Sequence, residues 1–254
     1  MESIFKLFKK PFRPLFQRLN LVLPLHSCLL SRLTPMSNVF GLDRGQPIDR
    51  YYIEAFLYEH RADIHGRVLE IQEPTYTCKF GTQVIKSDVL HITAGNPHAT
   101  IVGNLETGEG IPWNTFDCII ITQTYQFIYD VKSAILNSYR ALKPGGVLLA
   151  TFPGISHIVR GKMMISYVDN YDICTDNWRF TDASAKRLFE DIFEKKNVIV
   201  KTYGNVLTAC AFLYGLAAND LKQKELDYHD PDYQLLIAVR AIKPNSAFKY
   251  KEVL

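Results

Sequence analysis

At 254 residues, with 47% hydrophobic and 22% charged side chains, the chain has the composition of a globular protein with a sizeable core. The net charge of +3 is uneven, because residues 1–34 carry six Lys and Arg against one Glu; a basic arm on a slightly acidic body excludes the usual nucleic-acid-binding domain, whose folded face is basic. Five cysteines without a CxxC pair, and no His, Cys and Asp at metal-ligand spacing, argue against a disulfide framework or a metal site and favour a reducing, cytoplasmic compartment.

Residues 1–37 are predicted to be a basic N-terminal extension. Their apolar run, residues 19–30, is interrupted by Pro24 and is too short to span a bilayer. A segment of this kind can lie on an anionic membrane surface or dock on a protein partner, and it can equally pack on the body as a partly ordered extension. The folded domain is expected at 38–243, with a tail at 244–254.

The body begins with a helix, predicted from Ile48, in which Asp49 is placed to cap the first turn. Short apolar segments then predict three strands. These strands are expected at residues 67–71, 84–89 and 99–102.

A strand–helix–strand unit occupies residues 116–153. Its apolar runs, 118–121 and 147–150, are continuous, which is typical of strands covered on both faces. Apolar residues recur at helical spacing over 131–142, and the Lys-Pro-Gly-Gly sequence at 143–146 predicts the turn that ends this helix. A crossover of this kind joins parallel strands.

The C-terminal third adds one helix, two strands and an insertion. The helix is predicted at 182–193 with Thr181 or Asp182 as its cap, and the insertion contains a helical stretch at 207–221. The two strands are expected at 198–201 and 235–242. Seven strands with intervening helices predict an α/β, doubly wound, Rossmann-like sheet, in which the insertion and residues 163–178 form a lid.

Polar side chains follow four successive predicted strands, at the sheet edge where ligands bind in such folds. Asp88 is a carboxylate that can accept two hydrogen bonds, and Asn104 offers a side-chain oxygen. Thr122 and Gln123 follow the fourth strand. Each of these residues can also do no more than stabilise a turn, but their recurrence at the strand ends favours a ligand site.

The Phe116-Asp117 pair and the Leu-Lys-Pro-Gly-Gly sequence at 142–146 resemble a signature of the class I S-adenosylmethionine-dependent methyltransferases. A narrower likeness, to bacterial methyltransferase-like proteins linked with glycan or secondary-metabolite pathways, extends over residues 38–243. It rests on residues 43–45, 47–53, 66–71, 76–77, 80–81, 87–90, 122–124, 129–130, 153–156, 178–181 and 228–233. The resemblance implies a seven-stranded methyltransferase sheet with an antiparallel strand at the C-terminus, and S-adenosylmethionine as cofactor.

By this resemblance Asp88 would bind the ribose hydroxyls and Asn104 the adenine amino group. Tyr51 and Tyr52, preceded by Arg50, belong to the helix over the cofactor's carboxylate end, although their rings can equally pack on the sheet. The cofactor-binding set that the resemblance implies is Tyr51, Tyr52, Glu70, Gln72, Asp88, Val89, Asn104, Leu105, Thr122 and Gln123. The chain departs from the family where Gln72 stands for a glycine and Asn104 for an aspartate, which favours a tuned or lost cofactor site.

The residues expected to contact substrate are Tyr125, Trp178 and Arg179. Trp178 can stack on a sugar or an aromatic acceptor, and Arg179 can hold a carboxylate or a phosphate. His157, in the loop after the fifth strand, is the candidate base, because histidine can accept a proton near neutral pH. It can also be an ordinary surface residue, and methyl transfer can proceed without a base.

Three functional interpretations follow. The first is a cytoplasmic S-adenosylmethionine-dependent methyltransferase that acts on an oxygen or nitrogen atom of a small molecule, either a sugar or a natural-product intermediate. The second keeps the fold but catalyses a cyclisation or a rearrangement. The third is a non-catalytic partner of a biosynthetic enzyme, docked through the basic extension. The motifs favour the first, and none of the three involves a metal or a nucleic acid.

Overall fold

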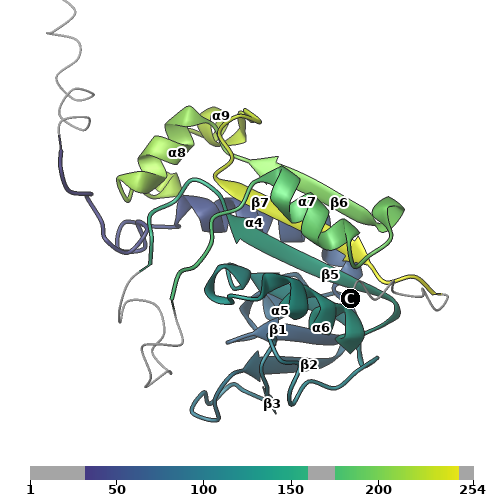
Figure 1. Cartoon of the computed structure of the whole chain (residues 1–254). Coiled ribbons are helices and arrows are strands. Elements are labelled where there is room, and N and C mark those ends of the chain that lie inside the picture. The colour runs from purple at the N-terminus through teal and green to yellow at the C-terminus, as the bar shows by residue number, and fades with distance from the viewer. Residues whose placement is uncertain (1–31, 160–174, 246–254) are drawn as a thin grey trace, which may run out of the picture.

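The computed structural model describes residues 32–159 and 175–245, and in these ranges seven strands form one sheet in the order β3-β2-β1-β4-β5-β7-β6 (Figure 1). The strands are β1 (Gly66–Ile71), β2 (Val84–His91), β3 (Ile101–Val102), β4 (Phe116–Thr122), β5 (Leu142–Pro153), β6 (Val198–Tyr203) and β7 (Leu236–Ile242). The strands β1 to β5 are parallel, and β7 is antiparallel to both of its neighbours, β5 and β6. The predicted doubly wound sheet with a C-terminal antiparallel strand is therefore confirmed.

Helices cover both faces of this sheet. They are α4 (Ile48–Glu59), α5 (Thr75–Phe80), α6 (Val131–Ala141), α7 (Asp182–Glu190), α8 (Val206–Leu213) and α9 (Gln223–Asp227). One cluster of buried residues joins the sheet to α6 and α7, and a second joins it to α4 and α8. In β4, Ile119 and Ile121 belong to the first cluster, while Cys118 and Ile120 belong to the second, as the alternation of a strand requires. Burial on both faces explains why this strand is a continuous apolar run.

Several predicted boundaries differ from the observed ones. The strand β2 extends to His91, two residues beyond its predicted end, because Leu90 pairs with Ile71 of β1. The sequence at 143–146 lies within β5, at a shift in its register with β4, rather than in a separate turn. The helix predicted at 207–221 is divided, since α8 ends at Leu213 and Gly215 has a φ of +72°.

The two predicted caps have opposite outcomes. Thr181 caps α7, because its Oγ1 accepts a hydrogen bond from the N–H of Ser184 at 3.2 Å. Asp49 does not cap α4: the cap position is Pro47, and the Asp49 carboxylate accepts from the adjacent N–H of Arg50 at 2.8 Å. Asp49 is the second residue of the helix, so its carboxylate meets one amide of the first turn, that of Arg50, from within the helix and not from the cap position.

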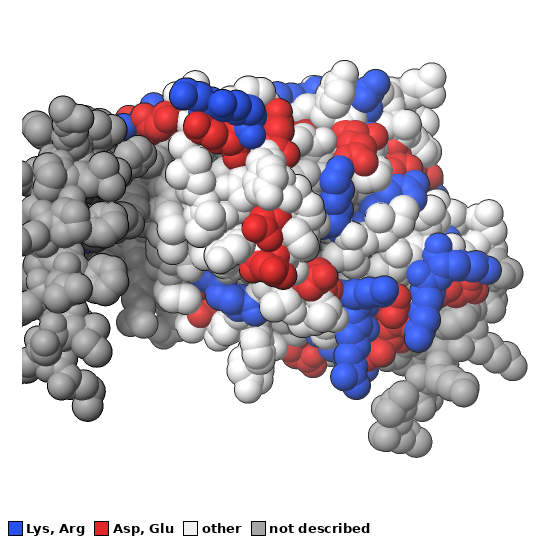
Figure 2. All heavy atoms as spheres, turned by 90° about the horizontal axis from the view of Figure 1, so that it is seen from above, with Lys and Arg blue, Asp and Glu red and all other residues white. Residues whose placement is uncertain are grey.

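Residues 1–31 of the basic extension, residues 163–174 of the expected lid and residues 246–254 of the expected tail lie outside the described residues. Among the helices that the structure does describe, none is long and apolar enough to cross a membrane. Figure 2 shows Lys and Arg interspersed with Asp and Glu on the face seen from above, so the described part of that face has no broad basic field.

Candidate functional site

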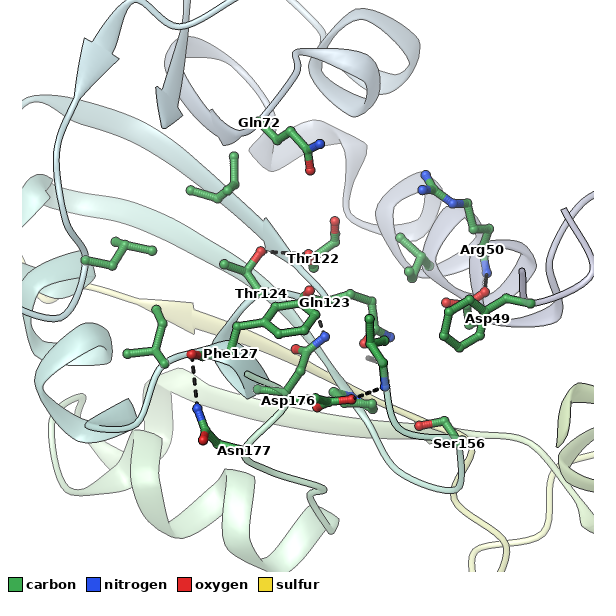
Figure 3. A pocket seen from close by; sticks show the side chains of 18 of the residues that line it. Asp49, Arg50, Gln72, Thr122, Gln123, Thr124, Phe127, Ser156, Asp176 and Asn177 are labelled. Atoms are coloured by element: carbon green, nitrogen blue, oxygen red, sulfur yellow. Dashed lines mark hydrogen bonds between the residues drawn. The ribbon is translucent and has the colours of Figure 1, made fainter. Parts of the chain in front are cut away.

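A cavity of about 760 Å³ lies at the carboxyl ends of the parallel strands (Figure 3). Its strand-end wall consists of residues at or just after the ends of β1 to β5: Gln72, Glu73, His91, Ile92, Gly103, Asn104, Leu105, Glu106, Thr122, Gln123, Thr124, Ser156 and His157. Its α4 wall consists of Val39, Phe40, Leu42, Asp49, Arg50, Ile53 and Phe212, and Asp176, Asn177 and Arg179 also line the cavity. Ligands bind at this edge in open α/β sheets, and the volume lies within the ~300–1,000 Å³ of small-molecule pockets.

The turn after β1 is built around Glu70. This residue is only 4% exposed, and its carboxylate accepts hydrogen bonds from the backbone N–H of Tyr76, at 2.9 Å, and of Thr77, at 2.7 Å. Burial raises the pKa of Glu70, and the two N–H donors oppose this rise. Glu70 therefore fixes the start of α5, a short helix that the sequence did not predict, and shapes the floor of the cavity.

Gln72 stands in the same turn with a φ of +72°, in the left-handed region that favours glycine. Its N–H donates to the carbonyl of Leu90 at 3.1 Å, and its own carbonyl accepts from the side-chain amide of Asn96 at 2.6 Å. The Gln72 side chain lines the cavity (Figure 3). The glycine that the family resemblance implies here thus matches the backbone conformation, which this chain keeps with a larger residue.

Asp88 does not reach the cavity. It lies inside β2, is 1% exposed, and accepts hydrogen bonds from Arg67 Nε at 2.7 Å and Thr100 Oγ1 at 3.0 Å, with Lys86 Nζ at 3.2 Å. Burial acts to raise the pKa of Asp88, but these donors together hold it below its ordinary value. The structure does not place Asp88 where the ribose contact was expected, because β2 continues to His91 and that residue lines the cavity instead.

The end of β3 brings two of the expected residues to the cavity, Asn104 and Leu105. The Asn104 Oδ1 accepts a hydrogen bond from the N–H of Glu106 at 2.8 Å, which confirms that this side chain stabilises its own turn. Val89 is 2% exposed and does not line the cavity; its N–H donates to the Thr100 hydroxyl at 2.9 Å. Val89 is therefore part of the core and not of the site.

The end of β4 presents Thr122 and Gln123 to the cavity (Figure 3). Gln123 has a φ of +47°, and its carbonyl accepts from the side-chain amide of Gln126 at 2.8 Å. Tyr125, expected to contact substrate, is fully buried, and its hydroxyl shares a hydrogen bond of 2.9 Å with the hydroxyl of Ser138. Burial raises the pKa of Tyr125. Tyr125 is a core residue because the turn after β4 directs its ring beneath the sheet edge, where it stacks on Phe152.

The first turns of α4 contribute Asp49 and Arg50 to the cavity, not the two tyrosines. Tyr52 is 3% exposed and its hydroxyl donates to the carbonyl of Leu226 at 2.8 Å, while the Tyr51 hydroxyl donates to Asp227 at 2.7 Å. Both rings therefore hold α4 against the insertion, which matches the packing interpretation of this pair.

Arg50 and Asp49 differ in their partners. The guanidinium of Arg50 donates to the hydroxyl of Tyr76 at 3.2 Å, whereas the half-buried carboxylate of Asp49 accepts only from the N–H of Arg50 among the described residues. Burial raises the pKa of Asp49 to about 6, against a smaller opposing effect of Arg50. The sequence predicted Asp49 only as the cap of its helix, so it gave no indication that this carboxylate lines the cavity.

Arg179 lines the cavity, but its guanidinium is already bound. It donates to both carboxylate oxygens of Asp176, at 2.5 and 2.6 Å, and to the carbonyl of His157. The segment after β5 is tied to the same carboxylate, because the N–H of Val159 donates to Asp176 at 2.8 Å. Trp178 is 40% exposed, does not line the cavity, and donates from Nε1 to the carbonyl of Ile128 at 3.1 Å. The terminal nitrogens of Arg179 are thus held by the protein, and Trp178 lies outside the lining of the cavity.

His157 does line the cavity, and its ring stacks on Phe40 with centroids 3.9 Å apart. Burial lowers the pKa of His157, and the nearby charge of Arg179 lowers it further. The imidazole is therefore neutral near pH 7 and can accept a proton. In the described part of the chain, no group of three or more His, Cys, Asp or Glu is arranged to hold a metal ion.

Comparison with known proteins places residues 75–150 in a methyltransferase domain family. A stretch of 55 residues is 46% identical to the ubiquinone/menaquinone biosynthesis C-methyltransferase of Klebsiella pneumoniae, covering 19% of this chain and 22% of that enzyme. The chain thus matches only about a fifth of the length of this curated relative.

Two solved structures are similar to this chain in their overall fold. A SAM-dependent methyltransferase from Archaeoglobus fulgidus is 13% identical, with a TM-score of 0.47 over 76% of this chain and 94% of that one. The 1,6-didemethyltoxoflavin-N1-methyltransferase of Burkholderia thailandensis, solved with 1,6-didemethyltoxoflavin and S-adenosylhomocysteine bound, is 10% identical, with a TM-score of 0.48 over 80% and 81%. Because both TM-scores are below 0.5, the likeness to methyltransferases rests on the domain match over residues 75–150 and on the order and directions of the strands.

Proposed function

We propose that the chain is a class I S-adenosylmethionine-dependent methyltransferase, which binds S-adenosylmethionine in the cavity and transfers the methyl group to an oxygen or nitrogen atom of a small molecule. A sugar or a natural-product intermediate is the acceptor that we favour. The domain that performs this reaction is proposed to span residues 38–243.

The observation that carries the proposal is the cavity itself. It lies at the carboxyl ends of β1 to β5, and residues after each of these strands contribute to its lining. Its volume of about 760 Å³ suits a cofactor and a small acceptor side by side better than a single small metabolite. The lining combines apolar side chains with a few convergent polar groups, as small-molecule sites do.

The cofactor is proposed to lie along the strand-end wall. Gln72 would border its methionine part, Asn104 and Leu105 the adenine, and Thr122 and Gln123 the sulfonium. Glu70 would act indirectly, through the turn that it holds. Arg50 is proposed to bind the cofactor's carboxylate, because its guanidinium reaches into the cavity beside Tyr76 and can form a charge-assisted hydrogen bond.

The acceptor is proposed to lie against the α4 wall and His157. Bound S-adenosylmethionine supplies an electrophilic methyl group on a sulfonium. The protein's contribution is to hold the acceptor atom in line with that methyl group, which supplies much of the rate of such a reaction. His157 can accept a proton from the acceptor, since it is neutral near pH 7 and its ring is fixed against Phe40.

Calorimetric titration with S-adenosylmethionine and S-adenosylhomocysteine tests the proposal. We expect Arg50→Ala to weaken the binding of S-adenosylhomocysteine by about tenfold or more, because a hydrogen bond to a charged group contributes about 1.5–3 kcal/mol. Arg61→Ala is the matched control, since Arg61 is exposed, lies outside the cavity and, among the residues that the structure describes, donates only to the nearby carbonyl of Tyr58. Absence of binding of both ligands to the unmodified protein would refute the proposal.

A further inference from the structure

The carboxylate of Asp49 is the charged group of the cavity that the proposed function leaves without a role. It is half-buried, it accepts one hydrogen bond from the N–H of Arg50, and it forms no ion pair with a side chain in the described residues. A buried carboxylate is costly unless a cation or several donors match it. The raised pKa of Asp49 is the sign of that cost.

Two other buried charged groups that line the cavity are matched within the protein. Arg179 is paired with Asp176, and the Glu70 carboxylate accepts from two backbone amides. Glu106, like Asp49, accepts a single backbone N–H, that of Asp130 at 2.9 Å, but it belongs to the strand-end wall along which the cofactor is proposed to lie. Glu73 is exposed and lies near the Arg50 guanidinium, whose pKa it helps to raise. Asp49 therefore stands apart from these groups.

The direction of the side chain separates Asp49 from the proposed cofactor carboxylate site. In Figure 3 the guanidinium of Arg50 reaches toward the end of the cavity where Gln72 lies, whereas the carboxylate of Asp49 lies toward Ser156. The cofactor's own ammonium group would lie with its carboxylate at the first end, beside Arg50 and the exposed Glu73. The Asp49 carboxylate faces the part of the cavity that is left for the acceptor.

We propose that Asp49 pairs with an ammonium group of the methyl acceptor, so that the acceptor is an amine. This inference rests on the proposed function and names its substrate class. The carboxylate supplies the negative charge that an aliphatic ammonium needs when it leaves water, and the ammonium supplies the cation that Asp49 lacks in the described structure.

The same pair prepares the nitrogen for reaction. Asp49 takes one proton from the ammonium group, which frees the nitrogen lone pair. The lone pair forms the new N–C bond while the C–S bond breaks, and the electron pair of that bond remains on sulfur. The product leaves as a methylated ammonium ion, and Asp49 returns its proton to water. A carboxyl group that titrates near pH 6 is ionised at neutral pH and is more basic than an ordinary aspartate.

Sinefungin tests this assignment without knowledge of the acceptor. It is an analogue of the cofactor in which a carbon with an ammonium group replaces the sulfonium with its methyl group, so it places a cation at the point of transfer. S-adenosylhomocysteine has no charge there. We expect the unmodified protein at pH 8 to prefer sinefungin, and Asp49→Asn to reduce that preference about tenfold while its affinity for S-adenosylhomocysteine stays within twofold.

Glu54→Gln is the control variant. It removes the same charge from the same helix, but Glu54 lies outside the cavity and pairs with Lys79 at 2.7 Å. Unchanged affinity for S-adenosylhomocysteine shows that each variant is folded. At pH 5 the Asp49 carboxylate is mostly protonated, so the preference of the unmodified protein should also fall; a pH response that persists in Asp49→Asn comes from other groups that line the cavity, among them His157 and Glu70.

Each outcome decides the inference. Selective loss of the sinefungin preference supports an amine acceptor. Equal weakening of both ligands overturns it, because Asp49 would then hold the cofactor's own ammonium group. Unchanged binding of both overturns it as well, and leaves the proposed cofactor site standing. Failure of the unmodified protein to bind S-adenosylhomocysteine refutes the proposed function, and this inference with it.

Discussion

The strand-end wall and the α4 wall of the cavity are stabilised in different ways. Along the strand-end wall, polar side chains bind the backbone of their own turns, as Glu70 does with α5 and Asn104 with Glu106. The α4 wall combines residues far apart in the sequence, such as Phe40, Asp49 and Phe212, and leaves one carboxylate without a cation among the described residues. The comparison indicates that the first wall fixes a shape and the second leaves an unmatched charge that a ligand can meet.

Glu70→Ala should break the strand-end wall and have the largest effect. It leaves two buried N–H groups at the start of α5 without an acceptor, and we expect the free energy of unfolding to fall by about 3 kcal/mol, at about 1–3 kcal/mol for each unmatched group. Urea unfolding measures the loss, and affinity for S-adenosylhomocysteine should fall with it. Glu73→Ala, in the same turn but exposed, should leave the stability unchanged. Equal stability of both variants would show that the wall does not depend on Glu70.

Asp88→Asn tests whether a residue inside β2, behind the strand-end wall, contributes to stability or to ligand binding. Because Asp88 binds Arg67, Thr100 and Lys86 behind the cavity, the substitution should lower the free energy of unfolding at pH 7 by about 2 kcal/mol and leave affinity for S-adenosylhomocysteine within twofold. The folded pKa of Asp88 is lowered, so its contribution is complete above the unfolded pKa of about 3.9 and is lost as the pH falls through the lower, folded value.

The difference between the Asp88→Asn variant and the unmodified protein should therefore narrow below about pH 4 in unfolding experiments. Asp191→Asn, which removes an exposed ion pair with Lys132, is the control and should change the stability little. A large loss of ligand affinity in Asp88→Asn would show that Asp88 belongs to the binding site.

Gln72→Gly is expected to have the smallest effect on the free energy of unfolding. Gln72 has a φ of +72°, and relief of a left-handed conformation should raise the free energy of unfolding by about 0.5–1 kcal/mol. Gln83→Gly is the matched control, because Gln83 has a φ of +55° and does not line the cavity. We expect only Gln72→Gly to change affinity for S-adenosylhomocysteine as well. Identical ligand affinities in the two variants would show that the Gln72 side chain lies clear of the cofactor.

The sequence predicted the sheet well because strands that are buried on both faces have apolar residues at consecutive positions. The runs at 118–121 and 147–150 are apolar at every position, and both lie in strands of the observed sheet. The end of β2 was harder to predict from the sequence, since its last residues belong to the strand only because they pair with β1. That error of two residues explains why Asp88 was expected at a strand end.

The candidate site was predictable only along the strand-end wall. Gln72, Asn104, Thr122 and Gln123 follow strands, so a correct reading of the strands brings them together. The α4 wall has no local pattern. Asp49 resembles a cap in the sequence, and the fold of the whole chain brings it to the same cavity as His157 and Asp176. The same limit applies to Trp178 and Arg179, whose polar atoms bind the protein itself.

The ion pair of Arg179 with Asp176 has a consequence for how this protein can vary. The Asp176 carboxylate also accepts from the N–H of Val159, and the Arg179 guanidinium donates to the carbonyl of His157, so this pair holds the residues after β5 to the residues before α7. Removal of one partner of a buried ion pair leaves the other charge unmatched, which costs about 3–5 kcal/mol. Substitutions at Asp176 and Arg179 are therefore expected to occur together rather than singly.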